Sequence, residues 1–271
     1  MGQLIRLRNE LTEMFKIKQI DTSDLDWIMC RVLGITRSQL NVDRQLNAIQ
    51  ILKIWKMAKL RFKGYPISLI FKDVEFYGLN FYVNRHVLAP RPETELLVEQ
   101  ILKSNSGCKG LDVGTGSGAI AVSLNKIGMC KMTAVDISSK AIKVAKKNAK
   151  KIGASVRFVK SNLFDKLSGE QFDFIVSNPP YIKTKDISFL DKEVKDYEPH
   201  IALDGGESGF YYYELIAKFA PEFLVDNGKL YLEVGVGQAE TVKQLLTPSF
   251  KNIEIINDYN KIGRIVIATK K

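Results

Sequence analysis

The chain has 271 residues, 45% of them apolar, and 40 lysines and arginines against 30 aspartates and glutamates give it a net charge of +10. This length and apolar content are typical of a globular protein with one large or two modest domains. The sequence has no run of about 18 uncharged apolar residues, and its charged first residues are not typical of a secretory signal, so we expect a cytoplasmic protein with no membrane contact.

The positive charge fits nucleic acid or another acidic partner, which long-range attraction would steer to the protein. It fits equally well a set of solvated helix faces such as the lysine-rich KVAKKNAKK. Contact with nucleic acid is therefore possible but not required. The cysteines Cys30, Cys108 and Cys130 form no Cys-x-x-Cys pair, and His86 and His200 lie far apart in the sequence, so we expect no metal site.

The first 70 residues are predicted to form helices. Apolar residues recur at helical spacing in LIRLRNELTEMFK and in VDRQLNAIQILKIWKMAKLRFKG, and DTSDLDWIMCRVLG begins with capping residues and ends at Gly34. The β-branched and aromatic stretch PISLIFKDVEFYGLNFYVNRHVLAP breaks at Tyr77 and Gly78, which predicts a β-hairpin. RPETELLVEQILKS follows as a helix with Pro92 in its first turn.

Strands and helices alternate from residue 110 to the end of the chain. The predicted strands are GLDV, KMTAVDI, SVRFVKS, FDFIVS, GKLYLEVG, IEIINDY and RIVIATK, and the helices between them are GAIAVSLNKI, SSKAIKVAKKNAKKIG, GFYYYELIAKFAPEFL and QAETVKQLL. This alternation predicts a mostly parallel sheet with helices on both faces. The short NKIG between the last two strands predicts an antiparallel hairpin there.

The loop LDVGTGSGAI follows the first of these strands, where open α/β sheets bind ligands. Gly114, Gly116 and Gly118 let the backbone turn sharply and approach a ligand closely. Asp136 ends the next strand, where its carboxylate can accept hydrogen bonds from ribose hydroxyls. The loop therefore indicates a nucleotide-type cofactor. A P-loop is excluded because Gly-Lys-Ser/Thr is absent, whereas NAD and a plain glycine-rich connector stay open.

The segment SNPPYI, residues 177–182, ends the apolar strand FDFIVS. Proline has a fixed φ and no N–H, so it cannot continue a central strand. The two prolines either terminate the strand or hold Asn178 and the adjacent backbone in one geometry for chemistry.

Taken together, LDVGTGSGAIA, VDIS, FDFIVSNPPYI, VLAPRPETELLVEQ and YEPHIALDGGESG resemble the HemK/PrmC family over nearly the whole chain. Members are S-adenosylmethionine-dependent methyltransferases that act on glutamine in peptide chain release factors. The resemblance implies a Rossmann-like class I methyltransferase fold. It divides the chain into a helical substrate-recognition domain at 1–70, a β-hairpin linker at 71–88 and a methyltransferase domain at 89–271.

The resemblance also implies S-adenosyl-L-methionine as cofactor and class 1 release factors as partner, with methylation at the glutamine of their Gly-Gly-Gln motif. NPPY alone is shared with DNA adenine methyltransferases, but its combination with PRPETE is more specific. Three alternatives stay open. One is a nucleic-acid adenine methyltransferase, which would need base flipping and for which residues 110–271 show no inserted recognition segment. The others are a glutamine methyltransferase of a ribosomal protein and a module that holds the cofactor as a structural ligand.

The site residues are carried over from the same motifs. The cofactor-binding set is Gly114, Thr115, Gly116, Ser117, Gly118, Asp136, Asn162, Leu163 and Asn178. The family often has Ser-Asp where this chain has Ser161 and Asn162, so the implied contact to adenine is uncharged.

Asn178 and Pro179 are the implied catalytic residues, since their side-chain and backbone carbonyls would each accept one N–H of the glutamine amide. Pro180 and Tyr181 complete the substrate-binding set, with the Tyr181 ring against the planar amide. Two further pairs have weaker assignments. Glu93 and Glu95 either complement the helix dipole or form a pocket wall, and Glu198 and His200 are expected at the surface with no catalytic role.

Overall fold

The computed structural model describes residues 2–105 and 107–271 and divides into two compact units, one ending at Phe71 and the other beginning at Lys72. In the described part of the chain, no helix has both the length and the apolar character that crossing a membrane requires. The same residues contain no cluster of His, Cys, Asp and Glu side chains that could hold a metal ion.

The first unit is helical, as its periodicity predicts. Its elements are α1 (Gln3–Ile17), α2 (Thr22–Leu33), the 3-10 helix η1 (Arg37–Asn41), α3 (Ala48–Phe62) and α4 (Ile67–Phe71). The Asp21 side chain caps α2 by accepting the N–H of Ser23, and α2 ends at Gly34 in the left-handed conformation. Leucines and phenylalanine on one face of α1 pack with Leu25, Ile28 and other apolar residues into a core of its own.

The segment 67–71 is helical, in line with the helical region expected at 1–70, although the stretch that predicts the hairpin also includes these residues. Its β-branched and aromatic residues favour a strand, but the N–H groups of Leu69 and Ile70 both donate to the carbonyl of Pro66 and close a helical turn. Ile67 and Phe71 pack against the core of the first unit, so tertiary packing overrides the local preference.

The β-hairpin forms at the expected break, with β1 (Asp73–Phe76) antiparallel to β2 (Leu79–Tyr82) and Tyr77 and Gly78 at the turn. By its contacts it belongs to the second unit. Phe76 and Phe81 are buried in a core cluster of that unit, and the Asn148 side chain bonds both the N–H and the carbonyl of Tyr82.

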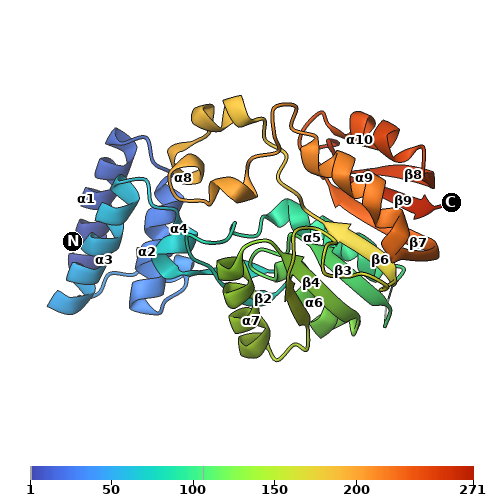
Figure 1. Cartoon of the computed structure of the whole chain (residues 1–271). Helices are drawn as coiled ribbons and strands as arrows, with labels where there is room; N and C mark the ends of the chain where they lie inside the picture. Colours follow the sequence, from blue (N-terminus) through green and yellow to red (C-terminus); the bar gives the residue numbers. More distant parts are fainter. Residues whose placement is uncertain (1, 106) are drawn as a thin grey trace. The chain divides into compact units, whose positions relative to one another are not determined.

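The second unit is built around one large sheet in the order β5-β4-β3-β6-β7-β9-β8 (Figure 1). Its strands are β3 (Lys109–Val113), β4 (Lys131–Asp136), β5 (Arg157–Lys160), β6 (Phe172–Ser177), β7 (Leu224–Glu233), β8 (Phe250–Asn257) and β9 (Gly263–Lys270). The strands from β5 to β7 are parallel, and β9 is antiparallel to both β7 and β8, which confirms the predicted terminal hairpin.

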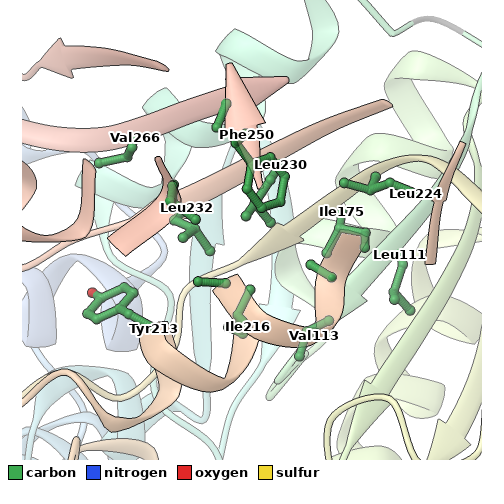
Figure 2. Packing of buried hydrophobic residues seen from close by; sticks show 14 of the residues in the cluster. Leu111, Val113, Ile175, Tyr213, Ile216, Leu224, Leu230, Leu232, Phe250 and Val266 are labelled. Carbon is green, nitrogen blue, oxygen red and sulfur yellow. The ribbon is translucent and has the colours of Figure 1, made fainter. Parts of the chain in front are cut away.

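Helices cover both faces of this sheet, as predicted. They are α5 (Pro92–Leu102), α6 (Ala119–Gly128), α7 (Ser139–Ile152), α9 (Tyr211–Phe223) and α10 (Ala239–Leu246), with the short η2 (Thr184–Phe189), α8 (Lys192–Lys195) and η3 (His200–Ala202) between β6 and α9. Alternate residues of each strand face opposite sides. Ile175 joins the cluster under α9 and α10, which Figure 2 shows together with Tyr213 and Ile216 of α9. Phe174 and Val176 join the cluster under α5 and α6.

Candidate active site

A cleft lies at the carboxyl ends of the parallel strands, where open α/β sheets bind their ligands. Its empty space, with the open solvent at its mouth included, is about 830 Å³. The segments that follow β3, β4, β5 and β6 all contribute to its lining: Gly114, Gly116, Asp136, Ile137, Ser138, Ser161, Asn162, Leu163, Asn178, Pro179 and Pro180. Residues that are far apart in the sequence therefore meet as the sequence predicts.

The glycine loop leaves room for a ligand at its tip. The N–H groups of Gly114 and Thr115 both donate to the Val135 carbonyl at 2.9 Å, which ties the loop to β4. Gly114 and Gly116 have φ values of 76° and 55°, which favour glycine, and among the described atoms nothing lies within 4 Å of a Cβ built on Gly114. The open side of this backbone faces the cleft and fits close approach by a cofactor.

Gly118 has a different task. A Cβ there would meet the Cβ of Ala145 on α7 at 3.0 Å, so this glycine allows α6 to begin tightly against α7. Thr115 and Ser117 are buried, and together with Gly118 they are not part of the cleft lining within the described residues. These three residues therefore support the conformation of the loop without lining the cleft.

Asp112, which the sequence analysis did not single out, lies beneath the loop. It is fully buried, and its Oδ2 accepts a hydrogen bond from Thr115 Oγ1 at 2.6 Å, whereas Oδ1 has no side-chain or backbone partner that meets hydrogen-bond geometry within the described residues. Burial raises the pKa of Asp112 to about 7, and the nearby Asp136 adds to the rise. The sequence feature that could have identified Asp112 is an acidic residue inside an apolar strand, two residues before the first glycine of the loop.

Asp136 holds the loop from the neighbouring strand. Its Oδ2 accepts the N–H of Gly116 at 2.9 Å and its Oδ1 accepts the N–H of Ser138 at 2.8 Å. Burial raises its pKa, and these two hydrogen bonds oppose the rise. Each carboxylate oxygen has a second lone pair, so Asp136 can still accept hydroxyl protons from a ligand in the cleft.

Asn162 and Leu163 line the cleft at the end of β5, where the sequence predicts them. Leu163 has a φ of 43°, a left-handed conformation that costs a non-glycine residue about 1–2 kcal/mol. Hydrogen bonds hold the turn on both sides, from the Asp165 N–H to the Asn162 carbonyl and from the Lys166 N–H to Ser161 Oγ. The turn presents an apolar side chain to the cleft, beside the amide of Asn162.

The Asn-Pro-Pro-Tyr corner is fixed on both sides. Ser177 Oγ donates to the Val113 carbonyl at 2.7 Å before the corner, and after it Ile182 exchanges backbone hydrogen bonds with Leu203 and Gly205. Asn178 Nδ2 donates to Thr94 Oγ1 at 3.2 Å. The strand therefore ends at Ser177, before the prolines, and these hydrogen bonds hold Asn178 at the cleft.

Tyr181 differs from its expected place. It is not part of the cleft lining in the described structure; its ring packs against a core cluster and its backbone carbonyl accepts a hydrogen bond from Gln238 Nε2 at 3.0 Å. Burial raises the pKa of its hydroxyl. Tyr181 therefore supports the Asn-Pro-Pro-Tyr corner through contacts with the protein core and does not line the cleft.

Glu198 was expected at the surface, and this expectation is wrong. Its side chain is 7% exposed, and Arg91 Nη2 lies 2.8 Å from each of its carboxylate oxygens. The pair joins the beginning of α5 to the segment whose residues Pro199 and Ile201 line the cleft. Sequence reasoning missed it because the partners are 107 residues apart. His200 is exposed, as expected.

The two glutamates of PRPETE also have definite places. Glu95 Oε1 accepts the N–H of Tyr77 at 2.7 Å and so holds the hairpin turn. Glu93 is exposed in the first turn of α5. Neither belongs to the cleft lining within the described residues.

The strand order, the glycine loop with Asp136, and the Asn-Pro-Pro-Tyr corner define a class I methyltransferase. Solved structures support this fold: a methyltransferase from Pyrococcus furiosus matches with a TM-score of 0.57 and 21% identity, over 72% of this chain and 90% of that one. A 16S rRNA N2 G1207 methyltransferase from T. thermophilus matches with a TM-score of 0.54 and 16% identity, over 73% of this chain and 50% of that one.

Sequence comparisons define the family. The methyltransferase small domain model matches residues 92–194. A release factor glutamine methyltransferase from Geobacter sulfurreducens is 40% identical over 90% of this chain and 87% of its own length. Another from Chlorobaculum tepidum is 37% identical over 96% of this chain and 95% of its own length. The chain belongs to the release factor glutamine methyltransferase family.

Proposed function

We propose that this protein transfers a methyl group from S-adenosyl-L-methionine to the side-chain amide nitrogen of a glutamine in peptide chain release factors. The target is the glutamine of the Gly-Gly-Gln motif, and the reaction takes place in the cytoplasm, where release factors act. The observation that carries the proposal is the amide of Asn178, which is held at the cleft with its Nδ2 donating to Thr94. Its Oδ1 is thereby available as an acceptor for a second amide.

The cleft fits the cofactor. Gly114 and Gly116 allow close approach, Asp136 offers carboxylate lone pairs for ribose hydroxyls, and Asn162 with Leu163 offers an amide and an apolar surface for adenine. When bound, S-adenosyl-L-methionine supplies an electrophilic methyl group carried on a positively charged sulfur. Thr115, Ser117 and Gly118 hold the loop in shape for this ligand.

The protein's own contribution is to orient a weak nucleophile. The lone pair of an amide nitrogen is delocalised into its carbonyl, so the nitrogen needs a fixed direction and stabilisation as positive charge develops on it. Asn178 Oδ1 and the Pro179 carbonyl each accept one N–H of the substrate amide. These protons become more acidic during the transfer, so both hydrogen bonds strengthen in the transition state. Pro180 and the partly buried Tyr181 support this alignment, which adds a proximity effect.

The helical first unit, which corresponds to the recognition domain expected at 1–70, is proposed to recognise the release factor. The glycine loop, Asp136 and the Asn-Pro-Pro-Tyr corner all belong to the second unit, which leaves the first unit free for the protein substrate. Its surface offers exposed apolar side chains, among them Ile49 and Leu52 on α3, beside basic residues such as Lys53 and Lys56. Such a mixed surface suits a protein partner.

The decisive experiment supplies labelled S-adenosyl-L-methionine with a class 1 release factor, with the same factor carrying Gln→Ala in its Gly-Gly-Gln motif, and with duplex DNA. Labelling of the first substrate alone is expected. Labelling of the Gln→Ala variant at an equal rate, or of DNA alone, would show that the proposed substrate is wrong.

A further inference from the structure

A buried acid, Glu233, lies behind the Asn-Pro-Pro-Tyr corner and has no role in the mechanism above. It ends β7, is 4% exposed, and follows Leu232, which pairs with Ser177 of the neighbouring strand. The sheet register therefore places Glu233 beside Asn178. Thr94, in the first turn of α5 and 3% exposed, completes the group.

The three side chains form one hydrogen-bonded network. Asn178 Nδ2 donates to Thr94 Oγ1 at 3.2 Å. The Glu233 carboxylate lies within reach of both side chains, and each of them lowers its pKa. An ionised carboxylate can only accept hydrogen bonds, so the part of the Asn178 amide that faces it must be the NH₂ group. Thr94 Oγ1 accepts from Asn178 in the structure, which leaves its own proton free to point toward the Glu233 carboxylate.

We propose that Glu233, acting through Thr94 and directly, is a positioning residue that holds the Asn178 amide with Nδ2 inward and Oδ1 toward the substrate. This inference rests on the proposed function, because the orientation matters only if Oδ1 accepts an N–H from the substrate. With the amide reversed, an NH₂ group would face the NH₂ group of the substrate, and the acceptor needed for transfer would be lost.

The surroundings of Glu233 make an ordinary structural ion pair a poor explanation. Arg264 on β9 is the nearby cation, but its Nε is bound to Asp258 Oδ2 at 3.0 Å. Glu93 on α5 adds a like charge. The Tyr213 hydroxyl donates to the backbone carbonyl of Glu233 at 2.9 Å, and burial together with the Glu233 charge raises the pKa of the Tyr181 hydroxyl. Glu233 Oε2 has no hydrogen-bond partner among the described residues. A buried acid with an unsatisfied oxygen costs stability, which is expected where a residue serves function.

Protonation of Glu233 should remove the preference of the Asn178 amide for one orientation. Burial raises the pKa of Glu233 to about 7, so the carboxyl gains a proton as the pH falls through this value. A protonated carboxyl can donate to Asn178 Oδ1, and Thr94 can then donate as well, so the reversed amide becomes equally satisfied. The rate of methyl transfer should therefore have an acid limb that depends on Glu233.

The test uses single-turnover methyl transfer to a release factor, with saturating cofactor and substrate, over a pH range that brackets 7. Glu233→Gln keeps the shape but can present either an acceptor or a donor to Asn178. We expect it to lower the rate about 10- to 100-fold at high pH, by analogy with residues that orient metal ligands, and to abolish the acid limb. Cofactor affinity, measured by calorimetry, should stay close to that of the wild type.

Two Thr94 variants give an independent measurement should Glu233→Gln fail to fold. Thr94→Val keeps the shape and loses the hydroxyl, so the rate should fall, whereas Thr94→Ser restores the hydroxyl and should recover most of the rate. Glu240→Gln, at an exposed position on α10, is the matched control and should behave as the wild type.

The outcomes separate two kinds of failure. If the wild type does not label the release-factor glutamine, the proposed function is wrong and this inference falls with it. If the wild type labels it and Glu233→Gln or Thr94→Val keeps the wild-type rate and acid limb, only the positioning role is wrong. A loss of cofactor affinity equal to the loss of rate, with no change in the acid limb, would likewise overturn positioning in favour of a structural role.

Discussion

The backbone N–H of Gly116 donates to Asp136 Oδ2 over 2.9 Å and so joins the cofactor loop to the end of the neighbouring strand. Asp136 thereby has two tasks, because the carboxylate that orders the loop is also the one that faces the cleft. A variant at this position tests cofactor binding and loop order together.

Asp136→Ala should weaken S-adenosyl-L-methionine binding by about 1.5–3 kcal/mol, the scale of hydrogen bonds to a charged group. Asp136→Asn keeps an acceptor but loses the charge and should fall between alanine and the wild type. Calorimetric titration with the cofactor measures both. Unchanged affinity in a folded alanine variant would remove Asp136 from the cofactor site.

The ion pair between Arg91 and Glu198 should contribute a measurable coupling energy to the stability of the protein. Arg91→Ala leaves a largely buried carboxylate without its cation, and should lower the free energy of unfolding by about 1–2 kcal/mol, less than a fully buried pair because Arg91 is partly exposed. In the double variant with Glu198→Gln, the loss should be smaller than the sum of the single losses. Strictly additive denaturation data would argue that the pair does not hold the segment at the cleft.

The pH dependence of stability should reflect Asp112 and Glu233. Burial raises both pKa values to about 7, from ordinary values of 3.8 and 4.5, so the folded protein holds protons that the unfolded chain releases. The stability due to these protons is fully present below the ordinary values and is lost as the pH rises through about 7, on the order of 1–3 kcal/mol for each group.

Asp112→Asn should make the free energy of unfolding depend less steeply on pH. The stability of the variant relative to the wild type should therefore increase as the pH rises. Urea unfolding at several pH values measures the effect by circular dichroism, because the two tryptophans, Trp27 and Trp55, both lie in the first unit and would report on that unit. A slope identical to that of the wild type would show that Asp112 is ionised across this range in the folded protein.

The periodic parts of the fold were predictable from the sequence, and contacts between distant segments were not. Alternating strands and helices fix the sheet, and the loop glycines, Asp136 and Asn178 all follow strand ends, so their meeting at one edge follows from topology. The helical turn at 67–71 depends on packing that local preference does not encode. The contact of Thr94 with Asn178 joins residues 84 apart, a pairing that one sequence does not reveal.

Recognition of the protein substrate should depend on the first unit. A chain that begins at Lys72, at the boundary between the units, should bind the cofactor with near wild-type affinity, because every residue of the cleft lining lies beyond that point. It should methylate full-length release factor far more slowly. Equal kcat/KM for the two proteins on that substrate would assign recognition to the second unit instead.

Asn178 offers the most discriminating measurement of the chemical step. Its Oδ1 is expected to stabilise the substrate amide mainly as the methyl group is transferred. Asn178→Ala should therefore lower kcat and kcat/KM by similar factors, about 10²–10³, with a much smaller change in cofactor affinity. Single-turnover transfer with both substrates saturating isolates this step.

Asn178→Asp adds a sharper variant, because the structure places Glu233 beside this position. Aspartate has no N–H to give to Thr94 or to the Glu233 carboxylate, and it brings a second buried acid next to the first, so one of the two must hold a proton near neutral pH. We expect transfer as slow as in Asn178→Ala, with the pH profile displaced from that of the wild type. Wild-type rates in both variants would mean that the Asn-Pro-Pro-Tyr corner only terminates β6, since neither substitution removes the prolines.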